Sequence, residues 1–241
     1  MEDTAMESLD RAQREALCCG EEYILVAAPP GSGKTRVLAS RFARLLNEGV
    51  ALSKITALTF TEKAAMEMSA RVSLATGRDL RAASIGTFHA LSLRILKEID
   101  PALRVIGRTG QLEALATLGL KQRKAENTAA RISFIKNIGL NMASLEDDFQ
   151  EIYNQYESYL SERGVLDLDD LITEGARAIE ENGLSGADLS HVLVDEYQDI
   201  NAPQVRLLRA LTRGGAHIFA IGDPDQAIYS FRGASLDFFL R

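Results

Sequence analysis

Near its N-terminus the chain carries the stretch Ala28-Pro29-Pro30-Gly31-Ser32-Gly33-Lys34-Thr35. An apolar run at residues 23–27 precedes it and is typical of a buried strand, and the apolar residues of 37–46 recur at helical spacing. A glycine-rich turn between a strand and a helix is the setting of a phosphate-binding loop. Its backbone N–H groups and the positive end of the helix would converge on a phosphate. Lys34 would then reach the β- and γ-oxygens, and the Thr35 hydroxyl would bind Mg²⁺.

One position departs from the usual pattern G-x-x-x-x-G-K-[ST], because Ala28 stands where the first glycine is expected. Alanine is compatible with such a loop as long as the backbone at that residue keeps a negative φ. The alternative is a turn that only joins the strand to the helix and binds no phosphate. A second motif argues against that alternative.

The second motif is His191-Val192-Leu193-Val194-Asp195-Glu196. Its apolar residues predict a short buried strand that ends in two adjacent carboxylates. Open parallel sheets place their chemistry outside the carboxyl ends of the strands, where Asp195 and Glu196 would emerge. Asp195 is then expected to hold Mg²⁺, and Glu196 to orient or deprotonate the attacking water. An isolated Asp-Glu pair is more often a solvated turn, but beside a phosphate loop it predicts a nucleoside triphosphatase.

The composition is that of an ordinary globular protein. The chain has 241 residues, of which 46% are hydrophobic and 25% are charged, enough for one sizeable core with an insertion or for two small domains. No apolar run approaches the length of a membrane span, and the start, Met1-Glu2-Asp3, is unlike a signal peptide. We therefore expect a cytoplasmic protein without a membrane partner. Cys18 and Cys19 are adjacent, with no further residue nearby to complete a metal site.

The net charge of −7 does not exclude a nucleic-acid partner, because the charge is unevenly spread. Residues 78–136 contain eleven Lys or Arg and five Asp or Glu, whereas residues 141–200 contain two Arg and sixteen Asp or Glu. A polyanion responds to the patch that it touches rather than to the total. Many of these charges are nevertheless expected to lie on ordinary solvated helix faces.

The alternation of predicted strands and helices indicates an α/β fold, a parallel sheet flanked by helices. Strands are predicted at 23–27, 55–60, 82–86, 191–194 and 216–221, and helices at 9–17, 37–46, 62–72 with Thr61 as its cap, 87–98 and 203–212. Between residues 99 and 186 strand-like alternation disappears, so this part is expected to be a mostly helical insertion. Residues 1–98 and 187–241 would then form the two parts of one nucleotide-binding domain.

The insertion contains a stripe of apolar and aromatic residues at helical spacing. The stripe consists of Phe149, Ile152, Tyr153, Tyr156, Tyr159 and Leu160. Such spacing favours the core of a helical subdomain over a ladder of rings that stacks on bases.

A loop that follows the last predicted strand would lie beside Asp195. It runs Gly222-Asp223-Pro224-Asp225-Gln226-Ala227-Ile228-Tyr229-Ser230-Phe231-Arg232-Gly233-Ala234. Gln226 could hydrogen-bond both a γ-phosphate oxygen and the attacking water. Tyr229, Phe231 and Arg232 suit stacking on unpaired bases and contact with their backbone. The loop therefore predicts a coupling between the state of the phosphate and the binding of a nucleic-acid strand.

Together these motifs resemble the front half of superfamily 1 DNA helicases of the UvrD/Rep/PcrA type, over essentially the full chain. Further stretches extend the resemblance, all in the order of the family. Residues 9–17, with Gln13, resemble the Q motif, residues 28–36 resemble motif I and residues 59–68 resemble motif Ia. Residues 85–91 resemble the next DNA-contacting motif, and residues 164–171 resemble the signature that closes the inserted subdomain. Residues 194–199 resemble motif II, and residues 222–234 resemble motif III. The resemblance implies a RecA-like P-loop NTPase fold, interrupted by the helical insertion.

The resemblance also implies roles for individual residues. Gln13 would read the edge of adenine and Arg36 would lie against it, while Lys34, Thr35, Asp195, Glu196 and Gln226 would bind Mg–ATP and carry out hydrolysis. Residues expected in or beside the path of single-stranded DNA are Phe60, Lys63, Thr87, His89, Tyr229, Phe231 and Arg232. Two positions depart from the family pattern, because Phe231 replaces a usual tryptophan and Tyr197 a usual phenylalanine.

Members of this family continue into a second RecA-like domain, which supplies arginines to the γ-phosphate, whereas this chain ends at Arg241. An arginine finger contributes several powers of ten to phosphoryl transfer. We therefore expect residues 1–241 alone to hydrolyse ATP very poorly and not to unwind duplex. The implied whole protein is an ATP-driven translocase that moves 3′ to 5′ on single-stranded DNA or from a 3′-tailed duplex. Repair, replication restart and recombination all remain open as its pathway.

Other functions stay open at this point. The chain could be the motor half of a helicase-nuclease, whose nuclease domain would lie beyond Arg241. It could also be a naturally short module that binds ATP and DNA without acting as a motor. A P-loop kinase of small metabolites is a weaker alternative, because it has no use for residues 226–232 or for motif Ia.

Overall fold

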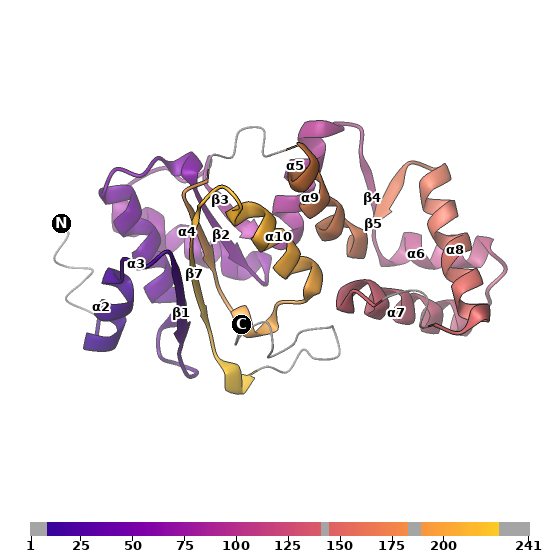
Figure 1. The fold of residues 1–241 in the computed structure, drawn as a ribbon, viewed down its shortest axis with the longest axis horizontal. Coiled ribbons are helices and arrows are strands. Elements are labelled where there is room, and N and C mark those ends of the chain that lie inside the picture. The colour runs from indigo at the N-terminus through magenta and orange to yellow at the C-terminus, as the bar shows by residue number, and fades with distance from the viewer. Residues whose placement is uncertain (1–8, 141–144, 183–188, 227–241) are drawn as a thin grey trace.

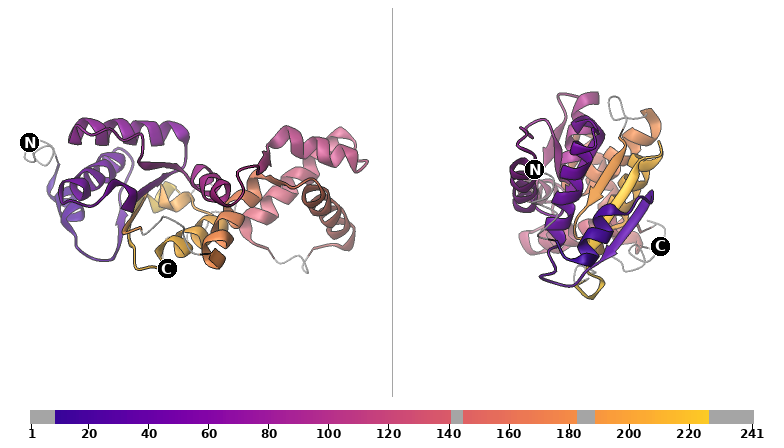
Figure 2. Two further views of the ribbon diagram at one scale, coloured as in Figure 1. Left: turned by 90° about the horizontal axis from the view of Figure 1, so that it is seen from above. Right: turned by 90° about the vertical axis from the view of Figure 1, so that its left-hand side faces the viewer.

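A computed structural model of the chain describes residues 9–140, 145–182 and 189–226. The molecule is elongated, with a sheet and its helices at one end and a smaller helical lobe at the other (Figures 1 and 2). None of the helices within the described ranges is long and apolar enough to cross a membrane.

Five parallel strands form the central sheet in the order β1-β7-β6-β2-β3. They are β1 (Tyr23–Ala27), β2 (Ile55–Thr59), β3 (Ser84–Thr87), β6 (His191–Val194) and β7 (His217–Gly222). Strands β6 and β7 come late in the chain, yet they lie between β1 and β2. The carboxyl ends of β1, β7 and β6 are therefore neighbours. The predicted parallel α/β architecture is confirmed.

Helices cover both faces of the sheet. On one face lie α3 (Lys34–Asn47) and α4 (Glu62–Thr76), with α2 (Arg11–Cys18) against α3. On the other face lie α5 (Phe88–Ile99), α9 (Leu168–Asn182) and α10 (Ala202–Thr212). In β6, Leu193 is buried in the first cluster, and Val192 and Val194 are buried in the second. Because both faces of β6 are covered, its sequence is a continuous apolar run.

The smaller lobe has a core of its own. It contains α6 (Arg108–Thr117), α7 (Gln122–Ile138) and α8 (Asp147–Glu162). The stripe predicted at 149–160 lies on α8, where Phe149, Tyr156 and Leu160 are buried and Ile152, Tyr153 and Tyr159 pack against them. The interpretation of this stripe as a helix core is confirmed.

Two short strands pair in parallel where the chain enters and leaves the lobe. They are β4 (Arg104–Ile106) and β5 (Val165–Asp167). The segment 99–186 is mostly helical, as predicted, but these two strands within it were not predicted. Each strand has only three residues, too few for an alternating pattern to be recognised.

Helix α9 leaves the lobe and packs between α5 and α10. A Cβ atom added at Gly175 would lie 2.8 Å from the Cβ of Ser92 and 3.1 Å from its Cα, so the α9 backbone crosses directly over Ser92 of α5. Ile172 and Ala176 of α9 share a cluster with Leu91 of α5 and Leu207 of α10. This last helix of the predicted insertion thus contributes to the core beneath the sheet.

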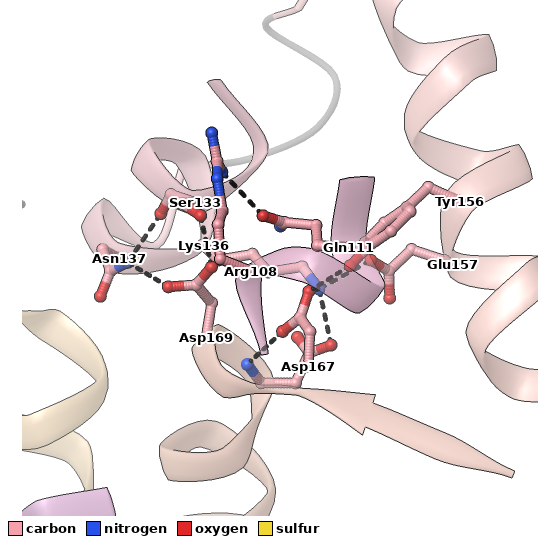
Figure 3. A network of polar contacts seen from close by, with 10 residues as sticks. Arg108, Gln111, Ser133, Lys136, Asn137, Tyr156, Glu157, Asp167 and Asp169 are labelled. Carbon is pink, nitrogen blue, oxygen red and sulfur yellow. Dashed lines mark hydrogen bonds and ion pairs between the residues drawn. The ribbon is translucent and has the colours of Figure 1, made fainter. Parts of the chain in front are cut away.

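A buried polar network joins the lobe to the start of α9 (Figure 3). The Lys136 ammonium of α7 lies 2.9 Å from Asp167, 2.6 Å from Asp170 and 2.8 Å from Glu157. Burial would lower the pKa of Lys136, but these three carboxyl groups outweigh it and raise that pKa. Burial raises the pKa of Asp170 to about 7, against the pull of Lys136 and with the help of Asp167 and Glu157.

A second branch of this network reaches α10. The Asn137 amide of α7 donates to Asp169 Oδ1 at 2.8 Å, and Ser133 donates to Asp169 Oδ2 at 2.5 Å. Asn201 is the N-cap of α10, and its amide donates to Asn137 Oδ1 at 2.5 Å. The lobe is thus hydrogen-bonded to the N-terminus of α10.

The contact between α5 and α9 gives a direct test of the fold. The change Gly175→Ala should lower the free energy of unfolding by about 1–3 kcal/mol, because its methyl group overlaps Ser92 and the two helices must separate. Urea titration of the purified chain measures this. Gly20→Ala is the matched control, since nothing lies within 4 Å of a Cβ there, and a loss of equal size in the control would contradict the packing described.

The raised pKa of Asp170 predicts a pH dependence of stability. Its pKa is 3.8 by reference and about 7 in the fold, so the folded state holds this proton more tightly than the unfolded state. The associated stability is fully present below about pH 4 and is lost as the pH rises through about 7. The change Asp170→Asn should therefore flatten the fall in unfolding free energy between those pH values. Asp147→Asn, at an exposed position on α8, should leave the slope unchanged; identical slopes in all three proteins would refute the assignment.

Candidate functional site: a cavity at the ends of three strands

The loop predicted to bind phosphate lies between β1 and α3. Gly31 and Gly33 have φ values of +73° and +83°, in the left-handed region where a side chain is strained. Ala28 does not have a positive φ, and its N–H donates to the Gly222 carbonyl of β7 at 2.9 Å. The alanine at the first loop position is therefore compatible with the loop, as the sequence analysis required.

Helix α3 begins at Lys34, and its N-cap residue, Gly33, makes no side-chain hydrogen bond to it. The N–H groups of the first turn are thus left for another acceptor, which makes this helix end suitable for an anion. The Lys34 side chain is only 9% exposed, and its ammonium lies 3.4 Å from Glu196 Oε2. Two motifs far apart in the sequence therefore meet at this helix end.

Asp195 follows β6 directly and is 4% exposed. The Thr35 hydroxyl donates to its Oδ2 at 3.3 Å. Burial and the neighbouring charge of Glu196 raise the pKa of Asp195 to about 6. A divalent cation next to Thr35 and Asp195 would relieve this penalty, and hydroxyl and carboxylate oxygens are ligands that Mg²⁺ prefers. The residues present thus fit the Mg²⁺ predicted from the sequence.

Glu196 adopts a left-handed backbone conformation, with φ +49° and ψ 47°. Among the described residues it is the only one other than glycine with a positive φ. Its N–H donates to Asp195 Oδ1 at 3.0 Å, and Gln198 donates to its Oε2 at 2.9 Å. The side chain is 37% exposed, so its carboxylate is held beside Lys34 and remains accessible to water.

These groups surround one cavity of about 520 Å³, a volume common for ligand sites. The residues that line it are Gln13, Pro30, Gly31, Ser32, Gly33, Lys34, Thr35, Arg36, Arg71, Glu196 and Gln226. Of the residues predicted to bind the nucleotide or to act in hydrolysis, only Ala28, Pro29 and Asp195 are not in the lining. Asp195 adjoins the cavity through its contact with Thr35. A larger hollow of about 620 Å³ along α8 contains none of the predicted site residues.

Gln13 is held against the loop by several hydrogen bonds. Its amide nitrogen donates to the Ser32 carbonyl at 2.7 Å, and its amide oxygen accepts from Arg36 at 3.0 Å. Asp10 and Gln13 also form a capping box at the start of α2. The predicted adenine-binding residues Gln13 and Arg36 thus lie together at one side of the cavity.

Arg71 lines the same cavity from α4 and was not predicted. Within the described part of the chain its exposed guanidinium has neither an ion pair nor a hydrogen bond. In the sequence it reads as an ordinary solvated residue of a helix. The packing of α4 against α3 brings Arg71 to the loop predicted to bind phosphate, and that packing could not be predicted from a local sequence pattern.

The residues predicted to contact DNA divide into two groups. Phe60 and Lys63 follow β2, whereas Thr87 is the last residue of the neighbouring strand β3 and His89 follows that strand. These four residues therefore share one end of the sheet. The Thr87 hydroxyl caps α5 by accepting from the Ala90 N–H, and it donates to Glu62 at 3.1 Å. Burial lowers the pKa of His89, against the opposing charge of Asp169. Tyr229, Phe231 and Arg232 lie outside the described residues, so their predicted role stays a prediction.

Comparison with known proteins agrees with this arrangement. Residues 9–241 match the family model described as UvrD/REP helicase N-terminal domain. The chain is 33% identical to the ATP-dependent DNA helicase PcrA of Staphylococcus epidermidis, over 96% of this chain and 35% of the relative. It is 32% identical both to the ATP-dependent DNA helicase Rep of Buchnera aphidicola (95% and 39%) and to UvrD1 of Mycobacterium tuberculosis (97% and 35%).

The chain thus spans a little over a third of the length of these curated relatives. The family model covers residues 9–241, which include the loop, the strand β6 and the lobe, and the relatives match 95–97% of the chain. The chain therefore belongs to the UvrD/REP helicase family, as its N-terminal domain.

Proposed function

We propose that this domain binds Mg–ATP in the 520 Å³ cavity and presents it for hydrolysis. The observation that carries the proposal is the meeting of two distant motifs, because Lys34 lies 3.4 Å from Glu196 and Thr35 lies 3.3 Å from Asp195. The cavity also has a helix N-terminus at its base and three cationic side chains in its lining, those of Lys34, Arg36 and Arg71. A triphosphate is the ligand that fits this charge.

Each residue has a defined task in the proposed reaction. Lys34 leaves its contact with Glu196 to bind β- and γ-phosphate oxygens, which frees the Glu196 carboxylate to orient and deprotonate a water. Mg²⁺ held by Thr35 and Asp195 would neutralise charge on the phosphates. Gln226 would bind a γ-phosphate oxygen together with the attacking water. Gln13 and Arg36 would hold the base, and Arg71 would add positive charge at the phosphates.

We also propose that the domain binds single-stranded DNA across the ends of β2 and β3. Phe60, Lys63, Thr87 and His89 lie there, and Tyr229, Phe231 and Arg232 are proposed to complete the path. The relatives named above are DNA helicases, which supports a DNA substrate. Movement 3′ to 5′ and entry from a 3′-tailed duplex belong to the same proposal.

The proposed division of the chain follows the sequence analysis. Residues 1–98 and 187–241 form the ATP-binding domain, and residues 99–186 form the inserted subdomain. Although α9 belongs to the inserted residues, it packs with α5 and α10, and we propose that it moves with the ATP-binding domain. The whole protein is proposed to act in the cytoplasm as a translocase or, alternatively, as the motor of a helicase-nuclease.

The Lys34→Ala variant tests the nucleotide site. Loss of the ammonium should weaken binding of a fluorescent Mg–ATP analogue more than tenfold, since a charge-assisted contact is lost. Binding of a single-stranded oligonucleotide should change less than twofold. Lys54→Ala, at the opposite end of β2, is the matched control. Full nucleotide affinity in Lys34→Ala would reject the proposed site.

Hydrolysis by the purified chain tests whether a further domain is required. Arginine fingers raise the rate of phosphoryl transfer by several powers of ten, and the resemblance implies that a second RecA-like domain supplies them. We therefore expect residues 1–241 to bind Mg–ATP but to release phosphate slowly, at a rate that single-stranded DNA does not increase. A phosphate-release assay with and without oligonucleotide measures this. DNA-stimulated turnover by residues 1–241 would refute the requirement.

A further inference from the structure

Gln198 lies in the short 3-10 helix Tyr197–Asp199 that follows Glu196, and it is 2% exposed. Its amide nitrogen donates to Glu196 Oε2 at 2.9 Å and to Asp199 Oδ2 at 3.2 Å. Its amide oxygen accepts from the Asp223 N–H at 2.8 Å. A buried primary amide needs such partners for both its donors and its acceptor.

This set of partners fixes the orientation of the amide. If the amide were reversed, its oxygen would face two carboxylates and its NH₂ group would face the Asp223 N–H. Burial and the charge of Glu196 raise the pKa of Asp199 to about 6. Gln198 donates to both of these carboxylates. The Gln198 amide therefore joins the Glu196 and Asp199 carboxylates to the Asp223 backbone.

The two ends of the bridge belong to different strands. Glu196 follows β6, whereas Asp223 follows β7 and accepts at its carbonyl from the Gln226 N–H at 3.0 Å. Gln226 lines the cavity of the proposed nucleotide site, as does Glu196. Beyond the last paired residues of β6 and β7, Gln198 thus continues the connection between these two strands.

We propose that Gln198 is a positioning residue that couples the Glu196 carboxylate to the Gln226 turn. The inference rests on the proposed nucleotide site and adds to it. A γ-phosphate that draws Gln226 inward also shifts the Asp223 backbone, and Gln198 passes this shift to the carboxylate that faces the water. Without the bridge, the two groups respond to the nucleotide independently, and the site loses part of its preference for a triphosphate.

The test compares the affinity of the purified chain for a non-hydrolysable Mg–ATP analogue and for Mg–ADP. Gln198→Met keeps the length of the side chain but removes its donors and its acceptor. We expect the ratio of the two dissociation constants to move toward one by about tenfold, which is the effect on affinity of losing one charge-assisted hydrogen bond. The dissociation constant for Mg–ADP should change little. Gln155→Met, on the exposed face of α8, is the matched control.

A second variant guards against a general loss of folding. Gln198→Glu removes the donors at neutral pH, but its protonated form regains one O–H donor and keeps the acceptor. The ratio of the two dissociation constants for Gln198→Glu is compared with the wild-type ratio at each pH. As the pH falls from 8 to 5, the ratio for this variant should return toward the wild-type value. A merely structural role would lower the melting temperature without this pH-dependent recovery.

The outcomes separate the two claims. If the wild-type chain binds neither nucleotide, the proposed nucleotide site fails. If it binds both, but Gln198→Met weakens them equally or leaves their ratio unchanged, the site stands and the bridge is overturned. A wild-type ratio of one would overturn the bridge as well.

Discussion

The pairing of β6 with β2 on one side and β7 on the other is the constraint on which the site depends. The phosphate loop and the two acids are separated by about 160 residues in sequence, and backbone hydrogen bonds of parallel strands bring their ends together. Because the cores on both faces include residues of β6, a shift of this strand by one residue would exchange its buried faces. The register therefore fixes Asp195 beside Thr35 as firmly as it fixes the core.

Polar contacts within the site engage several side chains that are proposed to bind a nucleotide. Lys34 faces Glu196, and Arg36 faces Gln13, whereas Asp195 is buried with a raised pKa. The triphosphate would place negative charge beside Lys34 and Arg36, and its cation would place positive charge beside Asp195. The second polar centre, around Lys136, carries more carboxyl groups than ammonium groups, and there the excess is met by the raised pKa of Asp170.

The sequence was sufficient to predict most of the sheet, the loop and the paired acids, because each has a local pattern. Glycines mark the backbone positions that need positive φ, and apolar runs mark strands buried on both faces. Strands β4 and β5 are too short to leave such a pattern. Arg71 and Gln198 could not be predicted, because their roles depend on α4 packing on α3 and on β7 ending beside β6. The position of α9 in the larger core could not be predicted either. It depends on the close contact of Gly175 with Ser92, and no sequence pattern links these two small residues.

The left-handed backbone at Glu196 has a consequence for how this protein could be altered. A residue with a Cβ atom in that region costs about 1–2 kcal/mol, and glycine would avoid the cost. Glycine would also remove the carboxylate. Selection for thermal resistance alone would thus favour a change that removes the carboxylate proposed to act on water, so at this position stability and the proposed activity make opposite demands.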